Sequence, residues 1–157
     1  HKVRIISVTK LDFPLIRSQD EFEHGALPPD IQQAQQAIQW CHHMVLIYPI
    51  WLGTMPALFK GFLEQTFRYG FAISEGSERF PKGLLADKSA RIIVTMGMPA
   101  FAYRWFFGAH GLFNLEKSIL KLAGLKPVKH CLFGLVENDK LALKRLDKLR
   151  ALGAHGS

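Results

Sequence analysis

The middle of the chain carries the stretch YPIWLGTMPALFKGF, residues 48–62. The apolar run that leads into it, Met44–Tyr48, is typical of a parallel strand buried on both faces. A proline ends this strand, and a second proline opens a helix predicted over Pro56–Phe67. The loop between them presents Trp51 and Leu52 beside backbone N–H groups that can bond a flat heteroaromatic ring. Spacing alone favours plain core packing of these two side chains, because large apolar residues are usually buried.

Strand-like and helix-like patterns alternate along the rest of the chain. The sequence predicts further strands at Val3–Val8, Arg91–Thr95 and Val128–Val136, and further helices at Asp30–Cys41, Leu112–Ala123 and Leu141–Leu152. Long connections are predicted at Leu11–Pro29, Tyr69–Lys88 and the aromatic-rich segment Gly97–Gly111, and Gly124 is predicted to close a helix. This order predicts an α/β fold with a mostly parallel sheet, whose ligands bind beyond the carboxyl ends of the strands.

Composition limits the class of protein. The chain has 157 residues, 48% hydrophobic and 21% charged, as expected for a single globular domain over residues 1–157. The net charge of +7 favours anionic ligands, but no nucleic-acid-binding motif accompanies it, so nucleic acid is a weak alternative. No apolar run is long enough to span a membrane, and His42-His43 lacks further ligands at metal spacing. The two cysteines exclude a disulfide scaffold and favour a reducing compartment, the cytoplasm.

The stretch at residues 48–62 resembles the signature of the flavodoxin-like NAD(P)H:quinone oxidoreductases, the family of DT-diaphorase and bacterial modulator of drug activity B. The pattern Pro-x-Trp-x-Gly-x-x-Pro-Ala-x-x-Lys-Gly occurs without a gap, and a Gly-Phe-Ala segment follows at residues 70–72. In this family the loop binds the isoalloxazine ring of a flavin. The resemblance therefore implies ring-binding roles for Pro49, Ile50, Trp51, Leu52 and Gly53. The Gly-Phe-Ala segment lines the substrate pocket in the family, frequently across a dimer interface, which implies substrate roles for Phe71 and Ile73.

A second match begins where another predicted strand ends. In related diaphorases a glycine-containing loop contacts the flavin, which implies cofactor-binding roles for Thr95, Met96 and Gly97. A tyrosine and a histidine at nearly this spacing stabilise the negative charge of the reduced flavin in those enzymes. Here they are Tyr103 and His110, with one more residue between them than in the family. The resemblance implies that both are catalytic, whereas their pattern alone favours structural roles.

The resemblance also implies what the protein does. The implied fold is a flavodoxin-like three-layer sandwich, and the implied reaction carries hydride from NAD(P)H through FMN or FAD to a quinone. A homodimer is implied as well. The alternative is a non-catalytic binding or regulatory subunit that has lost its cofactor, like the ancillary subunits of potassium-efflux systems.

The resemblance begins at the second strand of the family, at His1-Lys2-Val3-Arg4. The first strand of the family, its phosphate-binding loop and its first helix have no counterpart, so we expect an N-terminally truncated domain. In the strand order 2-1-3-4-5 the missing strand is central, and its loss exposes buried edges. A fragment of a longer chain, domain swapping, and direct pairing of the first strand with the third remain open. Without the phosphate loop, we expect weak flavin binding or none.

Overall fold

The computed structural model describes residues 1–75, 81–137 and 139–154, and for residues 139–144 it describes the backbone alone. Its strands pair in parallel in the order β1-β2-β3 and span His43–Pro49 (β1), Ser89–Thr95 (β2) and Val128–Phe133 (β3). The α-helices span Gln19–His24 (α1), Pro29–Trp40 (α2), Ala57–Thr66 (α3), Ala100–Trp105 (α4), His110–Asn114 (α5) and Asp139–Ala154 (α6). A 3-10 turn spans Val8–Lys10 (η1), and a π-helix spans Leu115–Leu120 (η2).

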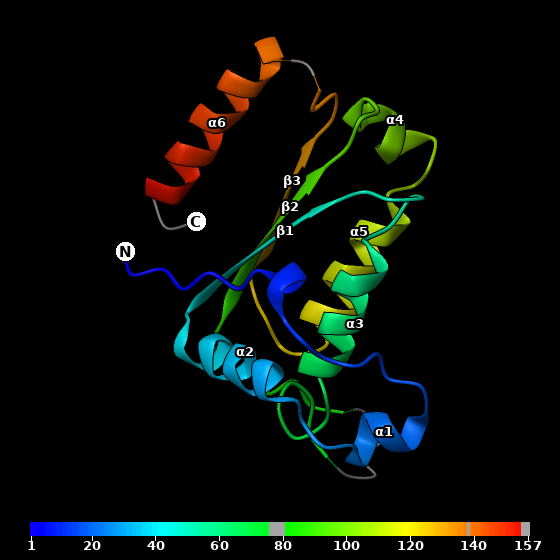
Figure 1. Cartoon of the computed structure of the whole chain (residues 1–157). Helices are drawn as coiled ribbons and strands as arrows, with labels where there is room; N and C mark the ends of the chain where they lie inside the picture. The colour runs from blue at the N-terminus through cyan, green and yellow to red at the C-terminus, as the bar shows by residue number, and fades with distance from the viewer. Residues whose placement is uncertain (76–80, 138, 155–157) are drawn as a thin grey trace.

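The sheet forms the middle of three layers, with α6 on one face and α2, α3 and α5 toward the other (Figure 1). On the face toward α3, Leu46 and Ile92 join the main apolar core. On the opposite face, Ile93 and Phe133 pack against Leu149 of α6. The α/β class and the three-layer arrangement predicted from the sequence are therefore confirmed.

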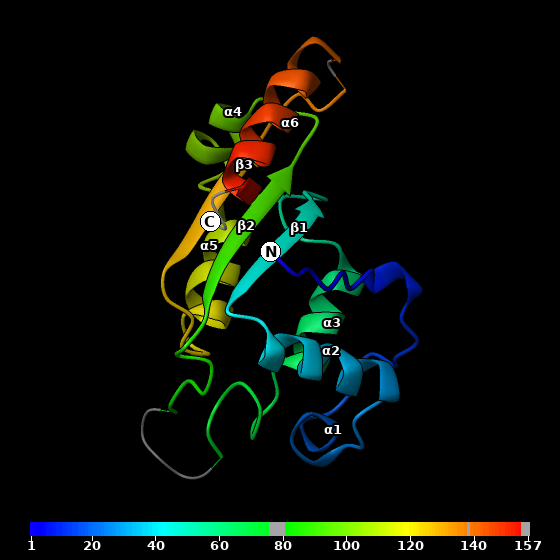
Figure 2. The same ribbon diagram turned by 90° about the vertical axis from the view of Figure 1, so that its left-hand side faces the viewer.

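Strand β1 is left partly uncovered. Helix α6 lies over the other two strands, and none of the described helices covers β1 on the same face (Figure 2). As a result, the side chains of Val45 and Ile47 are 51% and 63% exposed, although parallel strands are normally buried on both faces. Within the part of the chain that the structure describes, no strand pairs with the outer edge of β1.

The prediction of a strand at Val3–Val8 is wrong. This segment enters no sheet among the described residues, and it ends in the 3-10 turn η1. Val3 and Ile5 are 76% and 90% exposed, whereas Ile6 and Val8 pack against the core. β-branched residues favour a strand only where a neighbouring strand completes the ladder and packs against them. Among the described residues no strand pairs with this segment.

Two predicted connections contain short helices. Within the first connection, the side chain of Ser18 caps α1, and its Oγ accepts a hydrogen bond from the Glu21 N–H at 3.1 Å. The segment Gly97–Gly111, predicted as one continuous loop, instead forms α4 and begins α5. Helices this short carry too little hydrophobic periodicity to be found in a sequence, because tertiary packing stabilises them.

The helix predicted at Leu112–Ala123 is divided in two. Helix α5 runs into the π-helix η2, and Gly124 closes the segment at a φ of 100°, as predicted. The Lys121 Nζ donates to the Glu116 Oε1 at 2.6 Å, a pairing at the i, i+5 spacing of a π turn. Strand β3 ends at Phe133 rather than at the predicted Val136, because Leu135 turns the chain with a positive φ of 54°.

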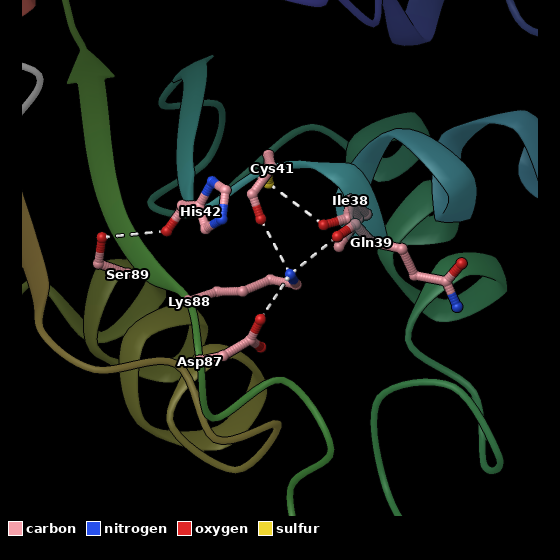
Figure 3. A network of polar contacts seen from close by, with 7 residues as sticks. All are labelled: Ile38, Gln39, Cys41, His42, Asp87, Lys88 and Ser89. Carbon is pink, nitrogen blue, oxygen red and sulfur yellow. Dashed lines mark hydrogen bonds and ion pairs between the residues drawn. The ribbon is translucent and has the colours of Figure 1, made fainter.

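A buried lysine joins the start of β2 to the end of α2 (Figure 3). The Lys88 Nζ donates to the carbonyl oxygens of Gln39 and Cys41 at 3.0 and 2.9 Å, and to the Asp87 Oδ2 at 3.2 Å. The two carbonyls lie where α2 ends, and a helix end needs donors for its last C=O groups. These bonds satisfy all three ammonium hydrogens, which offsets the cost of burying the charge.

The long connection after η1 is held against α3. A Cβ on Gly61 would collide with the side chain of Leu15, so the glycine lets this connection cross the helix closely. The Arg68 Nη1 donates to the carbonyl of Gly25 at 2.6 Å, farther along the same connection. Gly61 of the quoted stretch thus has a packing reason in this fold.

Candidate functional site

The loop after β1, residues 50–54, forms a tight and exposed turn, which we call the ring loop. Trp51 and Thr54 exchange backbone hydrogen bonds at 2.9 and 3.0 Å. Between them, Leu52 and Gly53 adopt positive φ angles of 49° and 83°, the left-handed geometry of a type I′ turn. The side chain of Trp51 is 63% exposed, and that of Leu52 is fully exposed. Core packing, which spacing alone favoured for these two side chains, is therefore wrong.

The end of β2 lies directly beside the ring loop. The Ile50 N–H donates to the carbonyl of Thr95 at 2.8 Å, which continues the β1–β2 ladder past Pro49. Met96 is buried, whereas a Cβ on Gly97 would meet nothing within 4 Å. The structure thus brings the predicted cofactor residues to one edge of the sheet: Pro49, Ile50, Trp51, Leu52, Gly53, Thr95, Met96 and Gly97.

Unbonded backbone donors gather at this edge. Among the described residues, the N–H groups of Leu52, Gly53, Gly97 and Met98 donate to no protein acceptor. Binding sites for small molecules combine apolar side chains with a few such backbone donors. An isoalloxazine ring has carbonyl and ring-nitrogen acceptors along its edge and a flat apolar face. This donor set, beside exposed Trp51, fits that ring. The sequence-based prediction missed the Met98 amide, although the residue lies inside the second matching segment.

Tyr103 lies on α4 beneath the ring loop and is only 1% exposed. Its Oη donates to the carbonyl of Gly53 and accepts a hydrogen bond from the Leu112 N–H, both at 3.3 Å. Burial raises the pKa of the Tyr103 phenol, so the hydroxyl stays protonated at neutral pH. The hydroxyl predicted to be catalytic thus joins the ring loop to the start of α5.

His110 begins α5 and is exposed. Gly108 and Ala109 turn the chain from α4 into α5 with φ angles of 62° and 47°. A Cβ on Gly108 would lie 2.5 Å from the His110 Nε2, so the imidazole rests over the Gly108 backbone. A Cβ on Gly111 would lie 2.8 Å from the Gly53 oxygen, so α5 packs directly on the ring loop. Gly111 was missed from the sequence, and its only signal there is its place beside His110.

Phe71 and Ile73 lie apart from these residues. The segment that contains them follows the C-terminal end of α3, at the opposite edge of the sheet from the ring loop (Figure 1). Helix α3 has 10 residues and therefore spans roughly 15 Å. The Gly70 N–H donates to the carbonyl of Ile73 at 2.8 Å. The side chains of Phe71 and Ile73 pack against the main apolar core. Within one chain the structure does not bring the predicted substrate residues to the predicted cofactor residues.

A cavity of about 340 Å³ opens beside α4, separate from the ring loop. Pro99, Phe101, Phe133 and Arg145 contribute to its walls. Arg145 is held in place because its Nη1 donates to the carbonyl of Leu135 at 3.1 Å. None of the residues predicted to bind cofactor or substrate lines this cavity.

Known proteins resemble this chain in sequence and in fold. A family model described as a flavodoxin-like fold matches residues 1–155. The chain belongs to this flavodoxin-like family. An NAD(P)H oxidoreductase of Haemophilus influenzae is 31% identical over 149 residues, which cover 90% of this chain and 72% of that protein. The rat NAD(P)H dehydrogenase (quinone) 1 is 25% identical over 116 residues, which cover 71% of this chain.

Two solved structures extend the comparison. A Streptococcus mutans protein shares 30% identity at a TM-score of 0.72, covering 90% of this chain and 73% of that one. An FMN-dependent NADH-azoreductase of Bacillus anthracis, solved with FMN, covers 88% of this chain and 73% of its own at a TM-score of 0.68. Its identity is 13%, so this likeness supports the fold alone.

These relatives confirm the flavodoxin-like fold and support the prediction of an oxidoreductase. The matched region is only 42% of the rat enzyme, less than half of its length. None of the helices in the described ranges is long and apolar enough to cross a bilayer. Nor do the His, Cys, Asp and Glu side chains described here form a group able to hold a metal ion.

Proposed function

We propose that this chain is a flavin-dependent NAD(P)H:quinone oxidoreductase that takes FMN or FAD at the ring loop. The observation that carries the proposal is the set of unbonded amides at Leu52, Gly53, Gly97 and Met98, next to the exposed side chain of Trp51. The residues of the ring loop and Gly97 would hold the flavin, which would supply hydride transfer from NAD(P)H to a quinone, and the quinone would take up a proton to become the hydroquinone.

Each element of the site has a part in this proposal. The amides donate to the acceptor edge of the ring, while Trp51 and Leu52 cover its face and exclude water. His110 is the predicted catalytic residue that reaches the surface, so we assign to it the stabilisation of negative charge on the reduced ring. Thr95 and Met96 hold Gly97 next to the ring loop through the end of β2.

A second copy of the chain would complete the substrate pocket. Within one chain, the segment that contains Phe71 and Ile73 lies beyond the far end of α3 from the ring loop. In a homodimer, the Gly-Phe-Ala segment of one copy can face the ring loop of the other. The proposal is therefore a homodimer that acts on a small quinone, with a cytoplasmic location as the free cysteines suggest.

Flavin titration of the purified chain tests this proposal. We expect FMN or FAD to quench tryptophan fluorescence at saturation, and the loaded protein to oxidise NAD(P)H in the presence of menadione. The W51A variant should weaken flavin binding by about tenfold, since aromatic stacking contributes roughly 1–3 kcal/mol. Trp40 is a matched control, because it is an exposed tryptophan at the far end of α2, and W40A should leave the affinity unchanged.

The opposite result would support the other function that the sequence allows. If neither FMN nor FAD binds while the chain still forms a stable dimer, the enzyme proposal fails. A non-catalytic binding or regulatory subunit is then the better description.

A further inference from the structure

The start of α5 lacks a cap from its own sequence. The residue before the helix is Ala109, which has no side-chain acceptor for the first free N–H groups. The N–H of Leu112, in the first turn, instead donates to the Oη of Tyr103. The capping group of α5 therefore comes from α4, across the left-handed turn that separates the two helices.

The same hydroxyl also holds the tip of the ring loop. Its hydrogen is directed to the carbonyl of Gly53, one of the two left-handed residues of the turn. A phenol has one hydrogen to donate, so Tyr103 cannot donate to a ligand while this bond exists. Because the residue is 1% exposed, a bound molecule would have to displace the loop itself to reach it.

We infer that Tyr103 is a positioning residue, which locks the ring loop to the start of α5 and so fixes the Leu52 and Gly53 amides relative to His110. The effect of this link on flavin binding rests on the proposed function. The link between the ring loop and α5, which we call the lock, is a property of the chain without ligand. Packing of Gly111 against the ring loop supports the lock, because the two segments already touch through their backbones.

Tyr48 offers a matched comparison on the neighbouring strand. It too is a buried tyrosine, 2% exposed, and its ring stacks on Phe59 at 5.2 Å. Among the described residues its Oη has no hydrogen-bond partner. Removal of the Tyr48 hydroxyl should therefore release no segment. Removal of the Tyr103 hydroxyl should free both the ring loop and the start of α5.

The experiment compares Y103F with Y48F in a chain whose other tryptophans, Trp40 and Trp105, are replaced by phenylalanine. Trp51 then reports on the ring loop alone. Without flavin, we expect the Leu112 amide to exchange its hydrogen several-fold faster in Y103F, and acrylamide to quench Trp51, which is already 63% exposed, modestly more strongly. With flavin, the Kd for FMN should rise about tenfold in Y103F. The pH profile of kcat should keep its shape, and Y48F should match the parent chain throughout.

The inference is overturned if Y103F folds, as judged by circular dichroism, but leaves both the quenching and the Leu112 exchange unchanged. A pH profile altered in Y103F, with the quenching unchanged, would instead make Tyr103 a catalytic proton donor. If no flavin binds to any variant, the proposed function fails, and the quenching and exchange measurements still decide the lock.

Discussion

The two edges of the sheet are each held by one buried polar side chain, and the two side chains differ in charge. At the amino edge, the ammonium of Lys88 ties α2 to β2 through three acceptors, one of them a carboxylate (Figure 3). At the carboxyl edge, the neutral hydroxyl of Tyr103 ties the ring loop to α5 through two longer bonds. Bonds to charged groups contribute about 1.5–3 kcal/mol each and neutral ones about 0.5–1.5 kcal/mol.

We therefore expect the amino edge of the sheet to contribute more to stability, and the carboxyl edge to contain the candidate site. The charged anchor joins α2 to the central strand of the sheet. The neutral anchor holds a turn whose side chains are exposed, and such regions open at lower free energy than the core. A ligand can therefore adjust the ring loop without disturbing the amino edge of the sheet.

The largest effect is expected at the charged anchor. K88M leaves the carbonyls of Gln39 and Cys41 without their donor, so it should lower the free energy of unfolding by about 3 kcal/mol. Urea unfolding followed by circular dichroism measures this. The control is K82M, because Lys82 is exposed, and it should change stability by less than about 0.5 kcal/mol. Equal effects of the two variants would show that the buried amine is not an anchor.

The buried carboxylate of Glu116 is a second charged group, and acid removes its charge by protonation. Burial raises the pKa of Glu116, but the bonds from Lys121 and His130 outweigh this and hold it below the ordinary value of 4.5. A carboxyl with a lowered folded pKa stabilises the protein above its unfolded pKa, and this contribution is lost as pH falls through the folded value. At neutral pH, E116Q should therefore cost about 2 kcal/mol.

Urea unfolding of E116Q and of the parent chain at several pH values tests whether the charge of Glu116 is what stabilises the fold. The difference in unfolding free energy between E116Q and the parent should shrink below pH 4.5 as the native carboxyl becomes protonated. E137Q serves as the control, because Glu137 is exposed. A cost of E116Q that stays constant from neutral to acid pH would mean that shape, not charge, matters at this position.

A smaller effect is expected at the contact between α5 and the ring loop. G111A places a Cβ 2.8 Å from the Gly53 oxygen and the Thr54 Cα, which should cost about 1–2 kcal/mol of strain. The strain falls on the ring loop, so FMN binding should weaken along with stability. Calorimetric titration and thermal unfolding measure the two quantities. Unchanged FMN affinity in G111A would separate this contact from the site.

The smallest effect belongs to a glycine with no neighbour. A Cβ on Gly153, in α6, would meet nothing within 4 Å. G153A should therefore raise stability by about 0.5–1 kcal/mol, since alanine is the better helix former. Thermal unfolding measures the gain, and FMN affinity should not change. A loss of stability would mean that the last turn of α6 is packed more tightly than these contacts indicate.

Local signals in the sequence were enough to predict much of the fold. Strand β1 and helix α3 were found because an apolar run and two prolines mark their limits within a few residues. The strand predicted at Val3–Val8 failed because its β-branched pattern says nothing about whether a neighbouring strand is available. The short helix α4 was missed for the converse reason, since only tertiary contacts stabilise it.

The structure brings the predicted cofactor residues to one edge of the sheet, but the geometry there could not be predicted from the sequence. The resemblance indicated Tyr103 and His110 together, yet one is buried and the other exposed. That difference depends on the left-handed turn at Gly108 and Ala109, which reverses the chain between two short helices. The Leu112 N–H is a backbone group with no side-chain signal, so its bond to Tyr103 could not be read from the residue types.

The open outer side of β1 has a consequence for how copies of this chain behave in solution. Val45 and Ile47 lie exposed on a strand whose outer backbone groups are unpaired in the described structure, a combination that favours edge-to-edge association. The net charge of +7 opposes this, because like-charged copies repel one another. Salt screens that repulsion beyond about 10 Å at 0.1 M ionic strength. Colloidal stability should therefore fall as salt rises, so light scattering across a salt series would register this exposed strand directly.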